Sequence, residues 1–167
     1  MTADAPTNTA STGATAAFMR GVERRAALLA QCQCGSETKG DAAVPAALRA
    51  FTRIAPDAPM AAWPVRFWSL LLAAPDLRRN ADDAAWPSTW APLAQLGNGP
   101  RAALLLRLVA GLGMDDAAAA LGVSADAYRT ALQRAIPYRE DGTPDRDGWL
   151  AWVAAVRVEI GGMQPDR

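Results

Sequence analysis

The chain has 167 residues, enough for one compact domain or two small helical ones, so a large two-domain enzyme is excluded. Its 17 Lys and Arg balance 17 Asp and Glu, and the absence of His excludes His-dependent catalytic triads and His-containing zinc sites. This neutral charge removes long-range attraction to phosphate, so any contact with DNA is expected to be local.

The composition predicts an all-α protein. Ala and Leu dominate the 51% of apolar residues, residue types typical of strands are sparse, and 12 Pro and 13 Gly interrupt the chain. We expect two small helical lobes, the C-terminal one a helix-turn-helix with an added amphipathic helix. No apolar run reaches membrane-spanning length and no signal peptide is evident, so we expect a cytoplasmic protein with no membrane partner.

The first half of the chain predicts a tail and three helices. Residues 1–16 are small and polar, which predicts a disordered tail. Apolar residues at helical spacing predict helices over 17–31, over 41–54 with Asp41 as its cap, and over 63–72. Residues 17–79 are therefore expected to form an N-terminal helical domain.

Residues 80–99 are rich in Pro, Gly and Asp and predict a linker. Trp86 and Trp90 lie within this segment. Because two indole rings are too costly to leave in water, we expect the linker to pack against one lobe.

Residues 100–139 carry the most specific pattern. Helices are predicted over 101–110, 117–121 and 125–136, with Asp115 and Asp116 opening the second. Gly122 supplies a left-handed turn and Ser124 an N-cap for the third helix. The pattern favours a helix-turn-helix over the alternative, an ordinary helical hairpin.

The stretch from Gly99-Pro-Arg-Ala-Ala-Leu-Leu-Leu-Arg-Leu through Ala118-Ala-Ala-Leu-Gly-Val-Ser to Arg134-Ala resembles the C-terminal promoter-reading domain of extracytoplasmic-function sigma factors of bacterial RNA polymerase. The resemblance implies that the helix after the turn enters the major groove of promoter DNA. It assigns DNA contact to Ser124, Asp126, Arg129, Thr130, Gln133 and Arg134. The chain departs from the family at Ala131, where an Arg is usual, and at Tyr128, where a small branched residue is usual.

The segment Asp41-Ala-Ala-Val-Pro-Ala-Ala-Leu-Arg-Ala-Phe51 is similar to the helix with which the same family grips core RNA polymerase. The resemblance implies that Asp41, Leu48, Arg49 and Phe51 bind the polymerase. Val44 and Pro45 replace the family's Gln and Glu. The segments Ala62-Trp63 and Leu77-Arg78-Arg79 are similar to the ends of the family's promoter-melting helix, with Leu70 in place of its Asn.

Residues 140–167 form a C-terminal extension. Its apolar residues Trp149, Trp152, Val153, Val156 and Ile160 form the stripe of an amphipathic helix. Two interpretations remain open. The helix either completes the core of the helix-turn-helix lobe, which we favour, or docks a partner protein.

These patterns predict a sigma-like DNA-binding protein that acts in transcription initiation, with promoter DNA and core RNA polymerase as partners and an anti-sigma or other regulatory protein as a further candidate. The alternative is a degenerate sigma fold that acts as a regulatory interaction module without binding promoters. No catalytic residue, metal site or cofactor is predicted. Cys32 and Cys34 are interpreted as free thiols, with a redox or metal role as the alternative.

Overall fold

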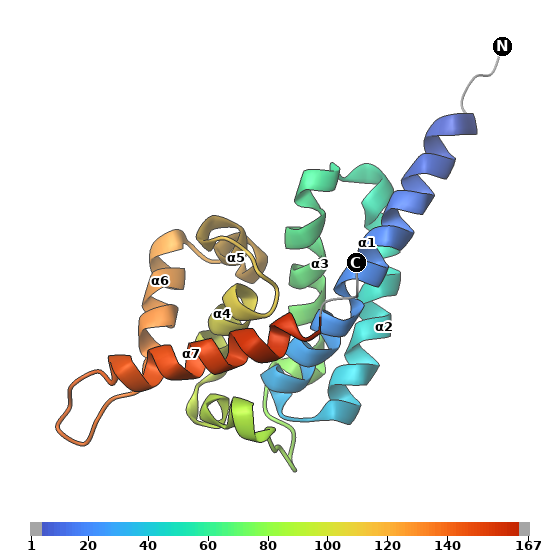
Figure 1. Ribbon diagram of the computed structural model, residues 1–167. Coiled ribbons are helices and arrows are strands. Elements are labelled where there is room, and N and C mark those ends of the chain that lie inside the picture. Colours follow the sequence, from blue (N-terminus) through green and yellow to red (C-terminus); the bar gives the residue numbers. More distant parts are fainter. Residues whose placement is uncertain (1–4, 164–167) are drawn as a thin grey trace.

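The computed structural model describes residues 5–163, with side chains described for residues 12–163. This part of the chain is all-α, as predicted, and contains no strand, only an isolated bridge between Tyr138 and Pro144 (Figure 1). The helices are α1 (Ala5–Cys34), α2 (Glu37–Ile54), η1 (Ala55–Asp57), η2 (Met60–Ala62), α3 (Trp63–Leu72), η3 (Pro75–Leu77), η4 (Ser88–Gln95), α4 (Asn98–Leu108), α5 (Met114–Leu121), α6 (Ala125–Arg134) and α7 (Arg146–Gly161), where η marks a 3-10 helix.

Helix α1 reaches back into the segment predicted to be a disordered tail. It begins at Ala5, so residues 5–16 are helical, while residues 1–4 lie outside the described part. Alanine is the strongest helix former, and the last turn of this segment also gains burial. Thr15 is 7% exposed and Ala14 packs against the core. The absence of large apolar residues therefore did not prevent helix formation.

Helix α2 begins earlier than predicted. Ser36, not Asp41, is the N-cap, and its hydroxyl accepts a hydrogen bond from the backbone N–H of Lys39 at 3.2 Å. The segment 32–40, which separates the two predicted helices, is reduced to a tight turn through Gly35, which has a φ of +73°. At Gly40 the backbones of α1 and α2 meet so closely that a Cβ would lie 2.7 Å from the backbone nitrogen of Gln31. The two helices thus form an antiparallel pair.

Aromatic rings fill the space between α1, α2 and α3. The rings of Phe18, Phe51, Trp63 and Phe67 contact one another with centroid distances of 4.9 to 6.0 Å. Most of these pairs meet edge to face, the arrangement that aromatic quadrupoles prefer. This aromatic cluster fixes α2 and α3 against α1.

The connector, residues 80–97, is fastened to the end of α1. The backbone N–H of Ala81 donates to the carbonyl of Cys34, and that of Ala85 to Gly35, at 2.8 and 2.9 Å. The indole N–H of Trp86 donates to the carbonyl of Cys32 at 2.7 Å, and Trp90 is fully buried. As predicted for its two tryptophans, the connector is packed and not free.

Arg101, at the start of α4, organises this junction from inside the protein. Only 1% of the residue is exposed, and its guanidinium lies over the ring of Trp86 at 4.7 Å. It donates hydrogen bonds of 2.6 to 3.0 Å to the carbonyls of Gln33, Leu93 and Leu96 and to the side chain of Asn80. Burial lowers its pKa. One arginine thereby joins α1, the connector and α4.

The two predicted helical groups share a single hydrophobic core. Helix α3 packs against α5, and α1 packs against α4, whose residues 101–106 are all buried. Of the described buried apolar residues, all but Ala81 and Ala102 form one cluster from Ala26 to Ile160. Figure 1 shows α1 to α3 lying directly beside α4 to α6.

Helix α7 folds back across α4 and η4 (Figure 1). Its predicted apolar stripe faces inward: Val156 and Ile160 are buried, and the indole N–H of Trp152 donates to the carbonyl of Thr89 at 2.6 Å. Outside this stripe, Leu150 and Val158 are 64% and 78% exposed. None of the described helices combines the length and apolar character that crossing a bilayer requires.

Candidate nucleic-acid interface

The turn between α5 and α6 has the local geometry that its sequence predicts. Gly122 ends α5 with a φ of +69°, a conformation that side chains disfavour. Ser124 then caps α6, its hydroxyl accepting a hydrogen bond from the N–H of Ala127 at 3.1 Å. Helices α4, α5 and α6 pack against one another. The unit is therefore two short helices joined by a three-residue turn and supported by a third helix.

Tyr128 fastens α6 to the core. The residue is fully buried, and its hydroxyl donates a hydrogen bond to the carbonyl of Ala103 on α4. Burial raises the pKa of this phenol, so the hydroxyl stays protonated and remains a donor. The departure from the family pattern at this position thus provides a polar anchor that sets the rotation of α6.

With Tyr128 turned inward, all six residues predicted to contact DNA face solvent. They lie within or directly before α6: Ser124, Asp126, Arg129, Thr130, Gln133 and Arg134. Ala131 and Leu132 are half-buried, so the missing arginine at position 131 lies at the edge of the exposed face. The five residues within α6 share its outer face, and Ser124 lies at the N-terminal end of the helix.

These six side chains differ in whether they already bind another group of the protein. The guanidinium of Arg129 pairs with the carboxylate of Asp126 at 3.0 Å, and the Thr130 hydroxyl donates to the carbonyl of Asp126. The side chains of Arg129 and Asp126 are 60% and 92% exposed, so water screens their pair. The side chain of Arg134 makes no hydrogen bond or ion pair with another described residue. It is thus the most available cation of the set.

Carboxylates offset the arginines on this surface. Asp115 and Asp116 are exposed in the first turn of α5, and Asp126 lies in the first turn of α6. Each carboxylate stabilises its own helix by interacting with the positive N-terminal end of the helix dipole, but each also repels phosphate. Around the turn three carboxylates therefore accompany two arginines, so this surface carries no excess of positive charge.

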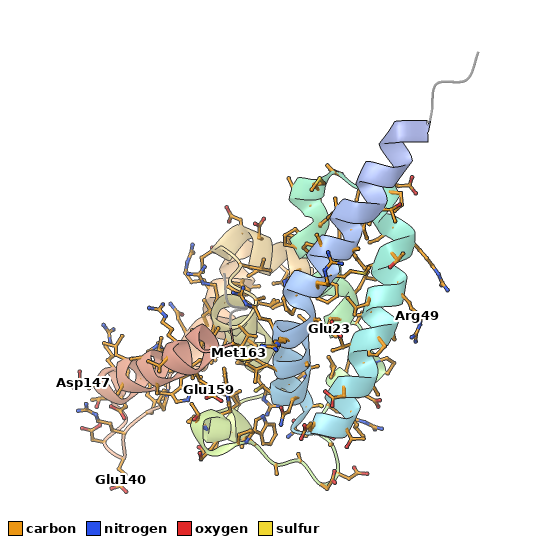
Figure 2. All side chains as sticks on the ribbon, turned by 45° about the vertical axis from the view of Figure 1, so that its right-hand side comes forward. Glu23, Arg49, Glu140, Asp147, Glu159 and Met163 are labelled. Atoms are coloured by element: carbon orange, nitrogen blue, oxygen red, sulfur yellow. The ribbon has the colours of Figure 1, made fainter. Side chains whose placement is uncertain are left out.

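The residues predicted to bind polymerase do not form one surface. Asp41 and Arg49 are exposed on α2 and Leu48 is half-buried, but Phe51 is fully buried in the aromatic cluster. Phe51 supports α2 from inside because its position on the helix points at α1 and α3. Figure 2 labels Arg49 on α2 beside Glu23 on the neighbouring α1.

Leu48 and Arg49 instead line a shallow groove that sequence reasoning missed. The groove holds about 400 Å³ between α1 and α2, and Met19, Arg20 and Glu23 of α1 form its other side. Because the pairing of α1 with α2 creates it, a motif search along either helix alone does not detect it.

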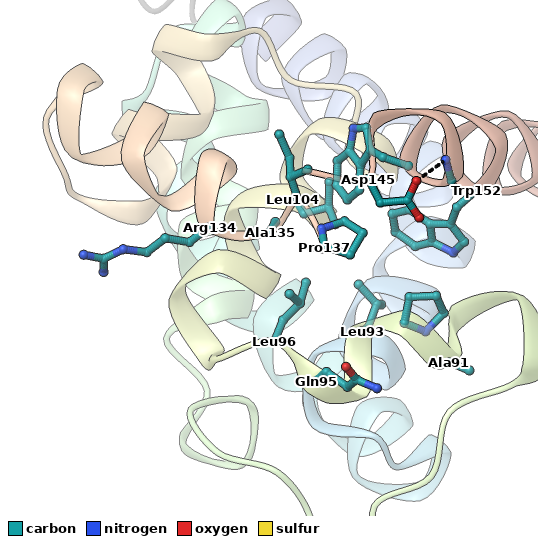
Figure 3. Close-up of a pocket in the computed structure, with 14 residues that line it drawn as sticks. Ala91, Leu93, Gln95, Leu96, Leu104, Arg134, Ala135, Pro137, Asp145 and Trp152 are labelled. Atoms are coloured by element: carbon teal, nitrogen blue, oxygen red, sulfur yellow. Dashed lines mark hydrogen bonds between the residues drawn. The ribbon is translucent and has the colours of Figure 1, made fainter. Parts of the chain in front are cut away.

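A larger groove of about 580 Å³ lies between η4, the end of α6 and α7. Its wall is mostly apolar, including Leu93, Leu96, Leu104 and Trp152. In the close-up the side chain of Arg134 extends away from these residues, while Asp145 turns to cap α7 by accepting from the N–H of Gly148 (Figure 3). Neither charged group faces the other, so the groove holds no acid–base pair.

Cys32 and Cys34 are both buried and free. Burial raises the pKa of each thiol, which disfavours the nucleophilic and metal-binding thiolate. No group of three or more potential metal ligands occurs among the described residues.

No protein family, curated protein or solved structure matches the chain.

Proposed function

We propose that the protein binds double-stranded DNA through the outer face of α6 and acts with RNA polymerase in transcription initiation, as a sigma-like protein. The observation that carries the proposal is the geometry of α6. Its six candidate contacts face solvent together, while Tyr128 anchors the opposite side of the helix to α4. The resemblance of residues 99–135 to promoter-reading domains supports the same role.

An α-helix fits the major groove, where side chains reach the edges of bases. Arg134, unpaired at the end of α6, suits a bidentate contact with guanine, and Gln133 beside it suits adenine. Arg129 has to leave Asp126 to make such a contact, which costs little for an exposed pair. Because Asp115, Asp116 and Asp126 repel phosphate, few backbone contacts are available and base contacts carry more of the affinity.

The test is a mobility shift with a promoter library at low salt. Arg134→Ala should lower the affinity by about 1 to 3 kcal/mol for a base contact, and less for a phosphate contact. The slope of log affinity against log salt should be shallow, roughly −2 to −4. Arg53→Ala, an exposed arginine on α2 that lies outside the segments resembling DNA-contacting parts of the sigma family, is the matched control. Absence of retardation by the intact chain would rule out the DNA-binding role.

The polymerase part of the proposal is supported by Leu48 and Arg49, which line the α1–α2 groove. A pull-down with core RNA polymerase tests it. Arg49→Glu should reduce capture, while Arg66→Glu should not. If the wild-type chain does not capture core polymerase, this part is wrong.

A second candidate function is a regulatory module that keeps a sigma-like scaffold and binds another protein without binding promoters. The observation that favours it is the junction around Arg101, which packs the helix-turn-helix region onto α1 and the connector. The lack of excess positive charge on the α5–α6 surface also favours it. Failure of both tests above, with a correctly folded chain, would select this alternative.

A further inference from the structure

A third groove lies beside the proposed DNA-binding face, between α4, α6 and α7, and holds about 300 Å³. Its floor consists of apolar side chains that are buried or half-buried: Leu104, Leu108, Leu132, Ile136, Trp149 and Val153. This floor exists because α7 lies across α4 and does not close fully against α6. Apolar surface therefore stays accessible from solvent.

The rim of this α4–α6–α7 groove carries one arginine from each of its three helices: Arg107, Arg129 and Arg157. All three are exposed, and no carboxylate lines the groove within the described part of the chain. Arg107 donates to the carbonyl of Leu112 at 2.7 Å, and Arg129 holds only its exposed pair with Asp126. The side chain of Arg157 has no hydrogen bond or ion pair with another described residue. The neutral protein thus concentrates positive charge around an apolar floor.

We propose that this groove binds an acidic amphipathic helix of a partner protein. Apolar side chains on one face of the partner helix would rest on the floor, and its carboxylates would pair with the three arginines, whose planar guanidinium groups match carboxylate geometry. The half-buried floor covers one face of an occupant, as a helix requires, and does not enclose a small molecule.

Two groove residues, Arg129 and Gln133, also belong to the proposed DNA contacts. A helix seated here covers them, so partner and DNA should exclude each other. This consequence rests on the proposed function, but binding of the acidic helix does not. The groove would then be the site at which a protein partner switches DNA binding off.

The test uses a fluorescein-labelled peptide of about 16 residues, with Leu at helical spacing on one face and Glu on the other. Its matched control carries Lys at every Glu position. Fluorescence anisotropy with the full chain should show saturable binding of the Glu peptide that weakens with salt, and no binding of the Lys peptide. Equal binding of both peptides, or of neither, would overturn the proposal.

Variants then locate the binding site. Arg157→Glu should weaken the Glu peptide about tenfold or more, and Arg157→Lys should retain most of the affinity. Val153→Glu should also weaken it by placing a carboxylate on the floor, and circular dichroism checks that this variant folds. Arg53→Glu on α2 is the charge-matched control and should change nothing. A larger loss from Arg53→Glu than from Arg157→Glu would place the peptide elsewhere and overturn the proposal.

Competition separates this inference from the proposed function. Saturating Glu peptide should release bound DNA, and the Arg157→Glu variant should keep its DNA while resisting release. Peptide binding by a chain that binds no DNA would support the groove and contradict the proposed function. Loss of DNA affinity in Arg157→Glu, with no peptide binding to the wild type, would assign the rim to DNA phosphate and overturn the inference.

Discussion

Arginine has opposite surroundings in two regions of this protein, the junction around Arg101 and the outer face of α6. Arg101 is buried and gives its donors to three backbone carbonyls and one amide side chain. Arg129 and Arg134 are exposed, and of their two side chains only that of Arg129 has a partner among the described residues. A buried cation with fixed partners is part of the scaffold, whereas exposed cations remain available to a ligand. The comparison separates residues that hold the fold from residues that can recognise DNA.

The largest effect should come from Arg101→Ala. Removing the guanidinium leaves the carbonyls of Gln33 and Leu96 without this donor, leaves that of Leu93 with only the backbone N–H of Leu96, and leaves a cavity beside Trp86. We expect a loss of about 3 to 5 kcal/mol in the free energy of unfolding, measured by urea denaturation. Arg134→Ala should change it by less than about 0.5 kcal/mol. Equal losses in the two variants would contradict the comparison.

The second-largest effect should come from alkaline pH, which should destabilise the junction around Arg101. Burial raises the pKa of Cys32, which lies one residue before Gln33, so the folded state holds the thiol proton more tightly than the unfolded state. This contribution is complete below the ordinary thiol pKa of about 8.5 and is lost as pH rises above it. Stability should fall by about 1 to 2 kcal/mol between pH 8 and pH 10. Cys32→Ala should flatten this dependence, and an unchanged slope would show that Cys32 does not cause it.

Tyr128→Phe tests whether the buried Tyr128 hydroxyl anchors α6 to α4. The variant keeps the ring and loses the hydrogen bond to the carbonyl of Ala103, so we expect a loss of about 1 kcal/mol in thermal or urea unfolding. Tyr138, 66% exposed, provides the control: Tyr138→Phe should leave stability unchanged. If the two variants behave alike, the buried hydroxyl does not stabilise α6.

The sequence predicted the helices better than the junction. The apolar spacing of 63–72 matches α3, and the Gly122 to Ser124 turn forms as expected because its signals are local. The start of α2 was misplaced because Ser36 and Asp41 are both competent caps and only packing selects between them. The junction was missed because Gln33, whose carbonyl accepts a hydrogen bond from Arg101, lies far from Arg101 in the sequence.

A signal for Arg101 did exist. It precedes Leu104, Leu105 and Leu108 by three, four and seven residues, which places it on the buried stripe of α4. Phe51 is the converse case. It follows a family pattern for a polymerase contact, but its apolar spacing with Leu48 and Ile54 already indicates a core position. Helical periodicity therefore locates buried residues, whatever their type, more reliably than motif membership does here.

The smallest effect on stability should come from Asp126→Asn. The variant removes the 3.0 Å pair with Arg129 but keeps a side chain that can accept hydrogen bonds at the start of α6. Because both partners are exposed, the free energy of unfolding should fall by less than about 0.5 kcal/mol.

The effect of Asp126→Asn on DNA affinity should be larger and opposite in sign. Losing a carboxylate from the proposed DNA-binding face removes repulsion of phosphate and frees Arg129, so binding should strengthen at low salt and the salt dependence should steepen. Asp57→Asn, an exposed carboxylate in η1, is the matched control and should alter neither quantity. Mobility shifts at two salt concentrations measure the difference, and weaker binding by Asp126→Asn would mean that Asp126 itself accepts a hydrogen bond from a base.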